Sequence, residues 1–292
     1  MLRHRVNATI SVHRTLQQGA NTQPALDPNP IGIFDSGSGG LSVLKEIVLH
    51  CPDESAIYVA DVAYCPYGGK SAAQVVERAQ RITHYLLEQG CKLIVVACNT
   101  ATSAAIGTLR AQHSAPFVGM EPAVKPASER SLTRSIGVLA TAGTLKGQRY
   151  AETTQRYAAD VEICIQAGDG LVELVEANRA QSPEAEALLA EYIEPMLAHR
   201  IDQLVLGCTH YPFLMDTIKK VLPEGVEIVN PAPSVARQCR RVLMERGLQA
   251  PVGATPHYRF HSSGSSDTLQ ALALSHVLSS HARASFHAHT PI

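Results

Sequence analysis

The sequence predicts an α/β protein of two similar, doubly wound parallel-sheet domains, related by pseudo-twofold symmetry, with a site in the cleft between them. Short apolar runs typical of strands alternate with amphipathic stretches typical of helices from Ile31 onward, which indicates parallel sheets covered by helices. The pattern also repeats, because the run that starts at Ile31 resembles the run at Ile136, and the segment around Cys98 resembles the one around Cys208. Both pairs are separated by nearly the same length of chain, so we expect two matched halves.

Each expected strand is a short, mostly apolar run, and each expected helix carries apolar residues at helical spacing. The first strand is followed by the turn SGSGG, and a helix opens directly after it. The second helix ends at Gly90, a helix-stop signal, while Pro195 interrupts the last one. In chain order, the expected strands are 31–35, 56–61, 92–97, 135–141, 161–166, 201–207 and 225–230. The expected helices are 41–50, 72–90, 101–112, 145–158 and 183–199.

This alternation predicts a discontinuous first domain over residues 31–122 and 231–283, and a second domain over residues 123–230. Residues 1–30 carry arginines and a Pro-, Asn- and Gln-rich end, but they lack the continuous apolar core of a secretory signal. We therefore expect residues 1–30 to form a flexible N-terminal extension. Residues 284–292 are expected to form a loose tail.

The bulk composition excludes several classes of protein. Hydrophobic residues make up 45% and charged residues 17% of the 292-residue chain, as in globular proteins. The net charge is −1 and no basic stripe stands out, so we expect no nucleic-acid partner. The longest apolar runs have the length of strands and fall far short of a membrane span, so we expect no membrane partner either.

The seven cysteines indicate a reducing compartment. Their number is odd, their spacing is wide and no C-x-x-C pair occurs, so we expect a cytoplasmic protein with neither a disulfide framework nor a bound metal. Cys98 and Cys208 each end an apolar strand at matching points of the two halves. Since sites in open α/β sheets lie beyond the carboxyl ends of the strands, we expect both thiols to face one cleft. Four other cysteines are expected to be small buried apolar groups: Cys51, Cys91, Cys164 and Cys239. Cys65 stays ambiguous, although the lack of a counterpart in the repeat favours the same reading.

The glycine-rich turn after Asp35 does not match a nucleotide site. The dinucleotide pattern G-x-G-x-x-G fails at Ser42, and the Lys-Ser/Thr pair of a P-loop is missing. The backbone N–H groups of such a turn suit a carboxylate as well as a phosphate. Asp35 either accepts a hydrogen bond from a ligand's ammonium group or caps the helix that follows. His210, two residues after Cys208, is either structural or a group that lowers the pKa of the thiol and shuttles a proton.

Six segments resemble the signature blocks of the glutamate racemases, in the same order and spanning about residues 31–280. They are IGIFDSGSGGLSVL, YVADVAYCPYGGKS, LIVVACNTATSAA, IGVLATAGT, LVLGCTHYPFL and NPAPSVA. The resemblance implies an isomerase that interconverts L- and D-glutamate for peptidoglycan synthesis, without cofactor, metal or nucleotide, and commonly as a homodimer. It implies that Cys98, as a thiolate, takes the α-proton of D-glutamate while Cys208 delivers a proton to the opposite face. The roles are exchanged for L-glutamate.

The resemblance also implies supporting roles. Asp35 and His210 are expected to assist Cys98 and Cys208 respectively. The residues that it implies for substrate contact are Asp35, Ser36, Tyr67, Gly68, Asn99, Thr100, Thr209 and His210, with Thr141 and Thr144 as further candidates for the carboxylates.

Several alternatives stay open. The stretch AGDGLVELVEAN lacks the Cys-Pro pair of many glutamate racemases, which leaves open whether Glu176 or Glu173 assists the second site. Aspartate racemases of the same superfamily resemble the chain at its first cysteine block, but their second block typically has Glu where this chain has His210. A two-lobed amino-acid binding protein would explain the matched halves but has no use for paired thiols. A thiol–disulfide oxidoreductase would need Cys98 and Cys208 within bonding distance.

Overall fold

The computed structural model describes residues 26–157, 160–279 and 282–292. Most of the expected N-terminal extension, residues 1–25, lies outside the described residues. Its last residues are held by the domain that follows, because the Asp27 N–H donates to the Gln249 carbonyl over 2.8 Å and the Lys92 ammonium donates to the Asp27 carbonyl over 2.5 Å. Among the described helices, none has both the length and the apolar content that crossing a membrane requires.

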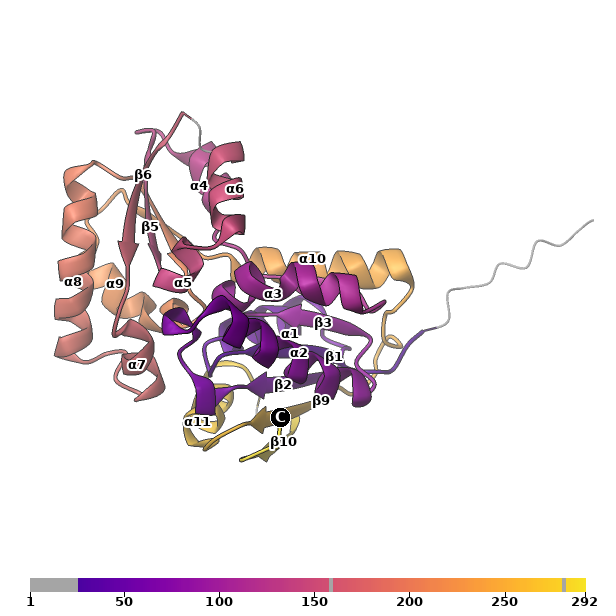
Figure 1. Ribbon diagram of the computed structural model, residues 1–292. Helices are drawn as coiled ribbons and strands as arrows, with labels where there is room; N and C mark the ends of the chain where they lie inside the picture. Colours follow the sequence, from indigo (N-terminus) through magenta and orange to yellow (C-terminus); the bar gives the residue numbers. More distant parts are fainter. Residues whose placement is uncertain (1–25, 158–159, 280–281) are drawn as a thin grey trace, which may run out of the picture.

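The first sheet has six parallel strands in the order β10-β9-β2-β1-β3-β4 (Figure 1). β1 lies inside this sheet and is buried along its whole length, as expected for a parallel strand covered on both faces. The strands are β1 (Ile31–Asp35), β2 (Ala56–Ala60), β3 (Leu93–Val96), β4 (Phe117–Gly119), β9 (His257–Ser262) and β10 (Arg283–His287).

Helices cover both faces of the first sheet. One face carries α1 (Leu41–His50), α10 (Ala232–Arg246) and α11 (Asp267–His276), and the other carries α2 (Ala72–Glu88) and α3 (Asn99–Gln112). The side chains of β1 divide between two cores: Ile31 and Ile33 join the core under α1, whereas Phe34 joins the core under α2 and α3. Alternate residues of one apolar strand thus anchor both layers.

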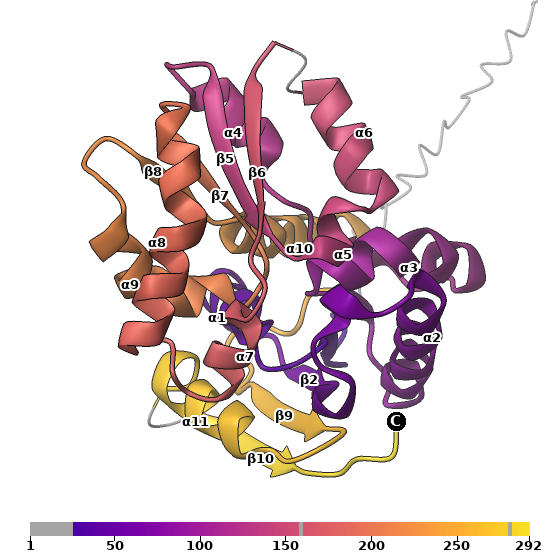
Figure 2. The ribbon, with the colours of Figure 1, turned by 60° about the vertical axis from the view of Figure 1, so that its left-hand side comes forward.

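The second sheet has four parallel strands in the order β6-β5-β7-β8. They are β5 (Ser135–Ala140), β6 (Glu162–Ala167), β7 (Gln203–Gly207) and β8 (Glu227–Val229). Figure 2 shows the helices on its two faces. One face carries α4 (Val124–Arg130) and α6 (Gln148–Tyr157), the other carries α7 (Leu171–Glu176), α8 (Pro183–Ala198) and α9 (Met215–Val221), and α5 (Ala142–Leu145) follows β5.

The structure confirms the predicted fold class of two α/β domains with parallel sheets. The two halves match in detail, because β1 lies between β2 and β3 just as β5 lies between β6 and β7. The helix expected over residues 145–158 is instead divided into α5 and α6. The domain boundaries at residues 122–123 and 230–231 stay a prediction.

The structure differs from the expected loose tail at residues 284–292. β10 pairs in parallel with β9, and Phe286 stacks on Phe260 with ring centroids 4.7 Å apart. Beyond β10, the Thr290 N–H donates to the Ser262 carbonyl over 2.7 Å, and Ile292 packs against the core under α2 and α3. Aromatic stacking and strand pairing hold this polar segment, and neither is visible in its own short sequence.

Candidate active site

A small cavity lies between the two sheets, beyond the carboxyl ends of their strands. Its volume is about 10 Å³, roughly the space that one water molecule needs. The lining residues come from both domains: Ser36, Pro66, Tyr67, Gly68, Cys98, Asn99, Thr100, Thr141, Thr144, Val172, Gly207, Cys208, Thr209 and His210. All the residues that the sequence analysis placed in the site line this cavity except Asp35, which precedes Ser36 and lies fully buried behind it.

Cys98 reaches the cavity because β3 ends two residues before it and α3 starts directly after it. The sulfur therefore sits at the N-terminus of α3, where it accepts a hydrogen bond from the Ala101 N–H over 3.4 Å. The Ser36 hydroxyl lies 4.0 Å away. Burial raises the pKa of the Cys98 thiol, the charge of Asp35 raises it further, and the Ala101 N–H opposes both.

Cys208 follows β7 in the second sheet as Cys98 follows β3 in the first. The Cys208 sulfur lies 3.8 Å from Nδ1 of His210. Burial by itself lowers the pKa of His210, but hydrogen bonds with Cys208, Cys65 and Glu176 outweigh burial and hold this pKa well above its usual value. The raised pKa favours the charged form of the imidazole, and an imidazolium stabilises a neighbouring thiolate.

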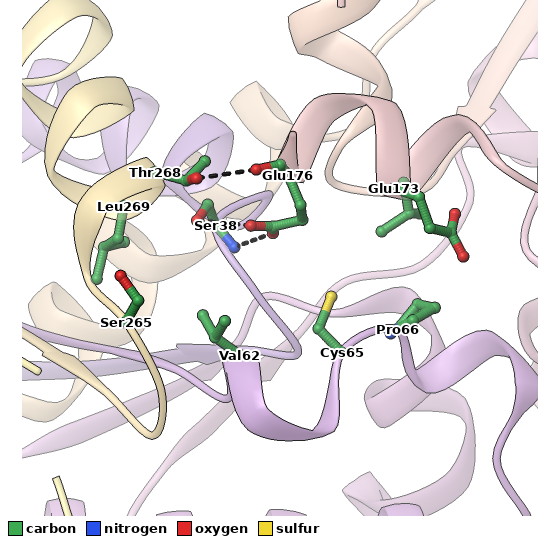
Figure 3. A pocket seen from close by; sticks show the side chains of 10 residues that line it. Ser38, Val62, Cys65, Pro66, Glu173, Glu176, Ser265, Thr268 and Leu269 are labelled. Carbon is green, nitrogen blue, oxygen red and sulfur yellow. Dashed lines mark hydrogen bonds between the residues drawn. The ribbon is translucent and has the colours of Figure 1, made fainter. Parts of the chain in front are cut away.

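Glu176, at the end of α7, is the carboxylate that meets His210. Its Oε1 lies 2.7 Å from Nε2 of His210, and the N–H and hydroxyl of Ser38 donate to the same carboxylate over 2.6 and 3.1 Å. Burial alone would raise the pKa of Glu176, but the contacts with His210 and Ser38 hold it below its usual value. Glu173 is exposed, and Figure 3 shows its carboxylate turned away from Ser38. Of the two glutamates that the sequence left open, Glu176 is the one that contacts His210, the residue next to the second cysteine.

Asp35 closes the glycine-rich turn. Its carboxylate accepts hydrogen bonds from the N–H groups of Gly37 and Gly40 over 3.2 and 3.1 Å, and from the Thr209 hydroxyl of the second domain over 3.3 Å. Burial raises the pKa of Asp35, against the opposing charge of His210. Holding the turn is thus a role that the structure shows, whereas assistance to a thiol stays a prediction.

The loop after β2 carries Tyr67 and Gly68 to the cavity through two short 3₁₀ turns, η1 (Val62–Tyr64) and η2 (Tyr67–Gly69). The Tyr67 hydroxyl donates to Asp61 over 2.5 Å, so this hydroxyl is bound within the protein and only the rest of the side chain faces the cavity. Gly68 approaches the second domain so closely that a Cβ there would lie 3.0 Å from Cβ of Thr141.

Two buried residues that hold this loop were missed by the sequence analysis. Arg78 donates from Nε and Nη2 to both oxygens of Asp61 over 2.9 and 2.8 Å, and the two residues are 4% and 0% exposed. The signal was present, because Arg78 lies between Val75 and Ile82 on the apolar stripe of α2, where a cation requires a buried anion. Asp61 directly follows β2 and is that anion.

The cavity also presents polar groups that lack partners. Asn99 is 3% exposed, and within the described part of the chain neither Oδ1 nor Nδ2 has a hydrogen-bond partner. A buried amide left unpaired costs free energy, which is typical of a site that a ligand completes. The hydroxyls of Thr100, Thr141 and Thr144 lie 2.9 to 3.3 Å apart and join the two domains at the cavity wall.

Together these contacts give the cavity one thiol from each domain, with different surroundings. Cys98 has a helix N-terminus and hydroxyls around it, and Cys208 has a charged His210–Glu176 pair. Such a cavity can bring two ionisable thiols into contact with one small polar molecule.

Comparison with known proteins gives concordant results. The family model described as Asp/Glu/hydantoin racemase matches residues 31–239. A glutamate racemase of Ectopseudomonas mendocina (strain ymp) is 48% identical over 246 residues, which cover 83% of this chain and 92% of that relative. A glutamate racemase of Pseudomonas aeruginosa (strain PAO1) is 47% identical over 236 residues, covering 80% and 89% respectively.

Solved structures of glutamate racemases also superpose on this chain. The Escherichia coli glutamate racemase in complex with L-glutamate and the activator UDP-MurNAc-Ala superposes with a TM-score of 0.77 at 32% identity, covering 89% of this chain and 98% of that one. The Francisella tularensis glutamate racemase in complex with D-glutamate superposes with the same TM-score at 27% identity, covering 89% and 97%.

Proposed function

The chain belongs to the Asp/Glu/hydantoin racemase family and, within it, to the glutamate racemases, which are isomerases, and on this premise we propose that it interconverts L- and D-glutamate by two-thiol proton transfer. The observation that carries the proposal is the pair of cysteines, Cys98 and Cys208, which come from corresponding strand ends of the two domains and line one cavity.

Inversion at the α-carbon requires two proton carriers. A single base returns the proton to the face that it left, whereas an acid on the opposite face delivers one there. In the proposed reaction the Cys98 thiolate takes the α-proton of D-glutamate while the Cys208 thiol gives its proton to the other face, and L-glutamate reacts in the reverse sense. A thiol suits both roles, because its reference pKa of about 8.5 lies near neutrality and responds to its neighbours. The charged His210 then stabilises the thiolate left at Cys208.

The proposed substrate contacts follow from the unpaired groups of the cavity. The Asn99 amide is unpaired and offers a donor and an acceptor. The hydroxyls of Ser36, Thr100 and Thr209 also line the cavity, and we propose that those of Thr100 and Thr209 exchange their present partners for the substrate carboxylates. We propose the Gly68 backbone and the ring of Tyr67 as the opposite wall. Asp35 and His210 complete the site as the groups that assist Cys98 and Cys208. No cofactor is part of the proposed reaction.

Glutamate is far larger than a cavity of about 10 Å³, so the two domains must separate to admit it. Two chain segments connect the sheets, one between β4 and β5 and the other between β8 and α10. We propose that opening occurs at these two segments and that closure then removes water from the reacting groups, which strengthens the electrostatic interactions inside the site.

The cellular role proposed here is the supply of D-glutamate for peptidoglycan synthesis, in the cytoplasm and by a homodimer. The free thiols support the location, because all seven cysteines lie in described residues and none forms a disulfide. Glutamate is the proposed small-molecule partner. Sedimentation at working concentration tests the dimer.

The experiment incubates the purified full chain with L-glutamate in heavy water, without added cofactor. We expect D-glutamate to form with deuterium at the α-carbon, and Cys98→Ala and Cys208→Ala each to abolish it, because each variant lacks the proton carrier of one face. Cys164→Ala, which replaces a cysteine outside the cavity, is the matched control and should keep the activity.

The same assay separates the alternatives. Faster turnover of aspartate than of glutamate would assign an aspartate racemase. Tight binding of glutamate with neither deuteration nor D-isomer would assign a binding protein. Racemisation that survives in both alanine variants would refute the two-thiol reaction.

A further inference from the structure

Three donor atoms gather beside the proposed catalytic cavity. The Cys65 sulfur, a carboxylate oxygen of Glu176 and a ring nitrogen of His210 all lie within 4.8 Å of one another. They come from the loop after β2, the end of α7 and the loop after β7, so no local spacing in the sequence shows them together. Gly37 marks the crowding, because a Cβ there would lie 2.2 Å from the Glu176 carboxylate and 2.9 Å from the Cys65 sulfur.

The chemistry of this donor set suits a borderline-soft divalent cation. A thiolate, an imidazole and a carboxylate are the three ligand types that zinc accepts in proteins. Zinc–ligand distances of about 2.0–2.3 Å in a tetrahedron place the donors roughly 3.3–3.7 Å apart. The three atoms lie within 4.8 Å of one another, so no pair needs to approach by more than about 1.5 Å. The Glu176 oxygen and the His210 nitrogen, now 2.7 Å apart, need to separate by roughly 0.6–1 Å to admit the metal between them.

A second cavity reaches two of the three donor residues. It has a volume of about 190 Å³, and Cys65 and Glu176 both line it (Figure 3). Glu173 also lines it, and Figure 3 shows the Cys65 sulfur pointing toward the helix that carries both glutamates. The acidic lining favours entry of a cation. The cavity leaves room for a water molecule as the fourth ligand, as in zinc sites with three protein ligands.

We propose that Cys65, Glu176 and His210 form an inhibitory site for Zn²⁺. The inhibition rests on the proposed function, in which His210 stabilises the thiolate of Cys208. Binding releases two protons to solvent, one from the Cys65 thiol and one held between His210 and Glu176. A metal on Nε2 of His210 takes the place of the proton between this nitrogen and Glu176. The shift of the ring that a shared metal requires disturbs the contact of its Nδ1 with the Cys208 sulfur. The turnover number therefore falls.

The test uses Co²⁺ as a spectroscopic probe and Zn²⁺ as the inhibitor, on the full chain. A surface group of Glu162, Cys164 and His199 offers a second set of donors, so every measurement is made in the Cys164→Ala background. Saturating D-glutamate occupies the space between Cys98 and Cys208 and prevents metal binding there. Cys65→Ser and Cys65→Ala are compared with the parent, each normalised to its own activity without metal.

We expect the parent to bind one Co²⁺ with a thiolate-to-cobalt charge-transfer band, and both Cys65 variants to lose the band. We expect the Zn²⁺ concentration for half inhibition to rise by at least about tenfold in both, since even an outer partner of a metal site contributes that much affinity. Equal Zn²⁺ sensitivity of parent and variants, or a band that persists without Cys65, would overturn the proposal. The band is measurable even if the chain racemises nothing, so failure of the metal site and failure of the proposed function are distinguishable.

Discussion

Replacing Arg78 by methionine removes the cation of a buried ion pair and keeps the apolar stem of the side chain. In the parent protein three side-chain atoms donate to the Asp61 carboxylate, which is 0% exposed: the Tyr67 hydroxyl and two nitrogens of Arg78. In the variant only the Tyr67 hydroxyl remains. Breaking a buried pair by removing one partner costs about 3–5 kcal/mol. Loss of the guanidinium 3.9 Å above the Tyr64 ring adds about 0.5–1 kcal/mol.

Urea unfolding followed by circular dichroism measures this loss. Arg78→Met should lower the free energy of unfolding by about 3.5–6 kcal/mol, a large share of the roughly 5–15 kcal/mol that a folded domain has. Arg81→Met, one turn away on the exposed side of α2, is the matched control and should stay within about 0.5 kcal/mol of the parent.

A double variant tests the cause. If the loss arises from a stranded charge, then adding Asp61→Asn to Arg78→Met should restore at least about 1 kcal/mol, because neighbouring sites of one network couple by roughly 0.5–3 kcal/mol. An Arg78→Met protein as stable as Arg81→Met, or a double variant less stable than Arg78→Met, would show that the pair does not hold this loop in the way argued.

Two further predictions concern other parts of the chain. Gly39→Ala would place a Cβ 2.3 Å from Nδ1 of His210, so we expect the ring to leave Cys208 and steady-state kinetics to show a turnover number lower by about 10²–10⁴. Gly107→Ala in α3, where a Cβ meets nothing within 4 Å, should instead keep full activity and gain up to about 1 kcal/mol; equal activity of the two variants would contradict the close approach. Burial, aided by the charge of His287, lowers the pKa of His261 from 6.5 to about 4, so between these pH values the unfolded chain binds more protons than the folded one and stability falls as the pH falls. The loss by pH 4 is up to about 3 kcal/mol, and urea midpoints at pH 7 and pH 4 should show a smaller loss in His261→Phe; an unchanged loss would assign the effect to other groups.

Most strands could be predicted because burial on both faces makes them uniformly apolar. The runs that became β1, β3, β5 and β7 carry this signal. β9, with the sequence HYRFHS, was missed because polar residues alternate with aromatic ones. β10 was missed because its partners, Phe260 for Phe286 and His261 for His287, lie in β9 and far away in sequence.

Site residues that directly follow a strand could be predicted from the sequence. Residues whose role depends on contacts across the cleft could not. Cys98 and Cys208 were predicted to face one cavity because each ends a strand, and both line it. The choice between Glu176 and Glu173 could not be made, because it depends on the distance to His210, a residue of another strand end. The direction of the Tyr67 hydroxyl likewise depends on Asp61, which no pattern links to it.

The hydrogen bonds of the glycine-rich turn form a seam between the domains. Ser38 of the first domain binds Glu176 of the second, the Ser42 hydroxyl donates to the Thr209 carbonyl over 2.9 Å, and the Thr209 hydroxyl reaches back to Asp35. Parting of the domains breaks these bonds together, and with them the contacts that orient the imidazolium. In the proposed reaction an open molecule is therefore inactive, and its thiols meet the charged imidazole only after the substrate is enclosed.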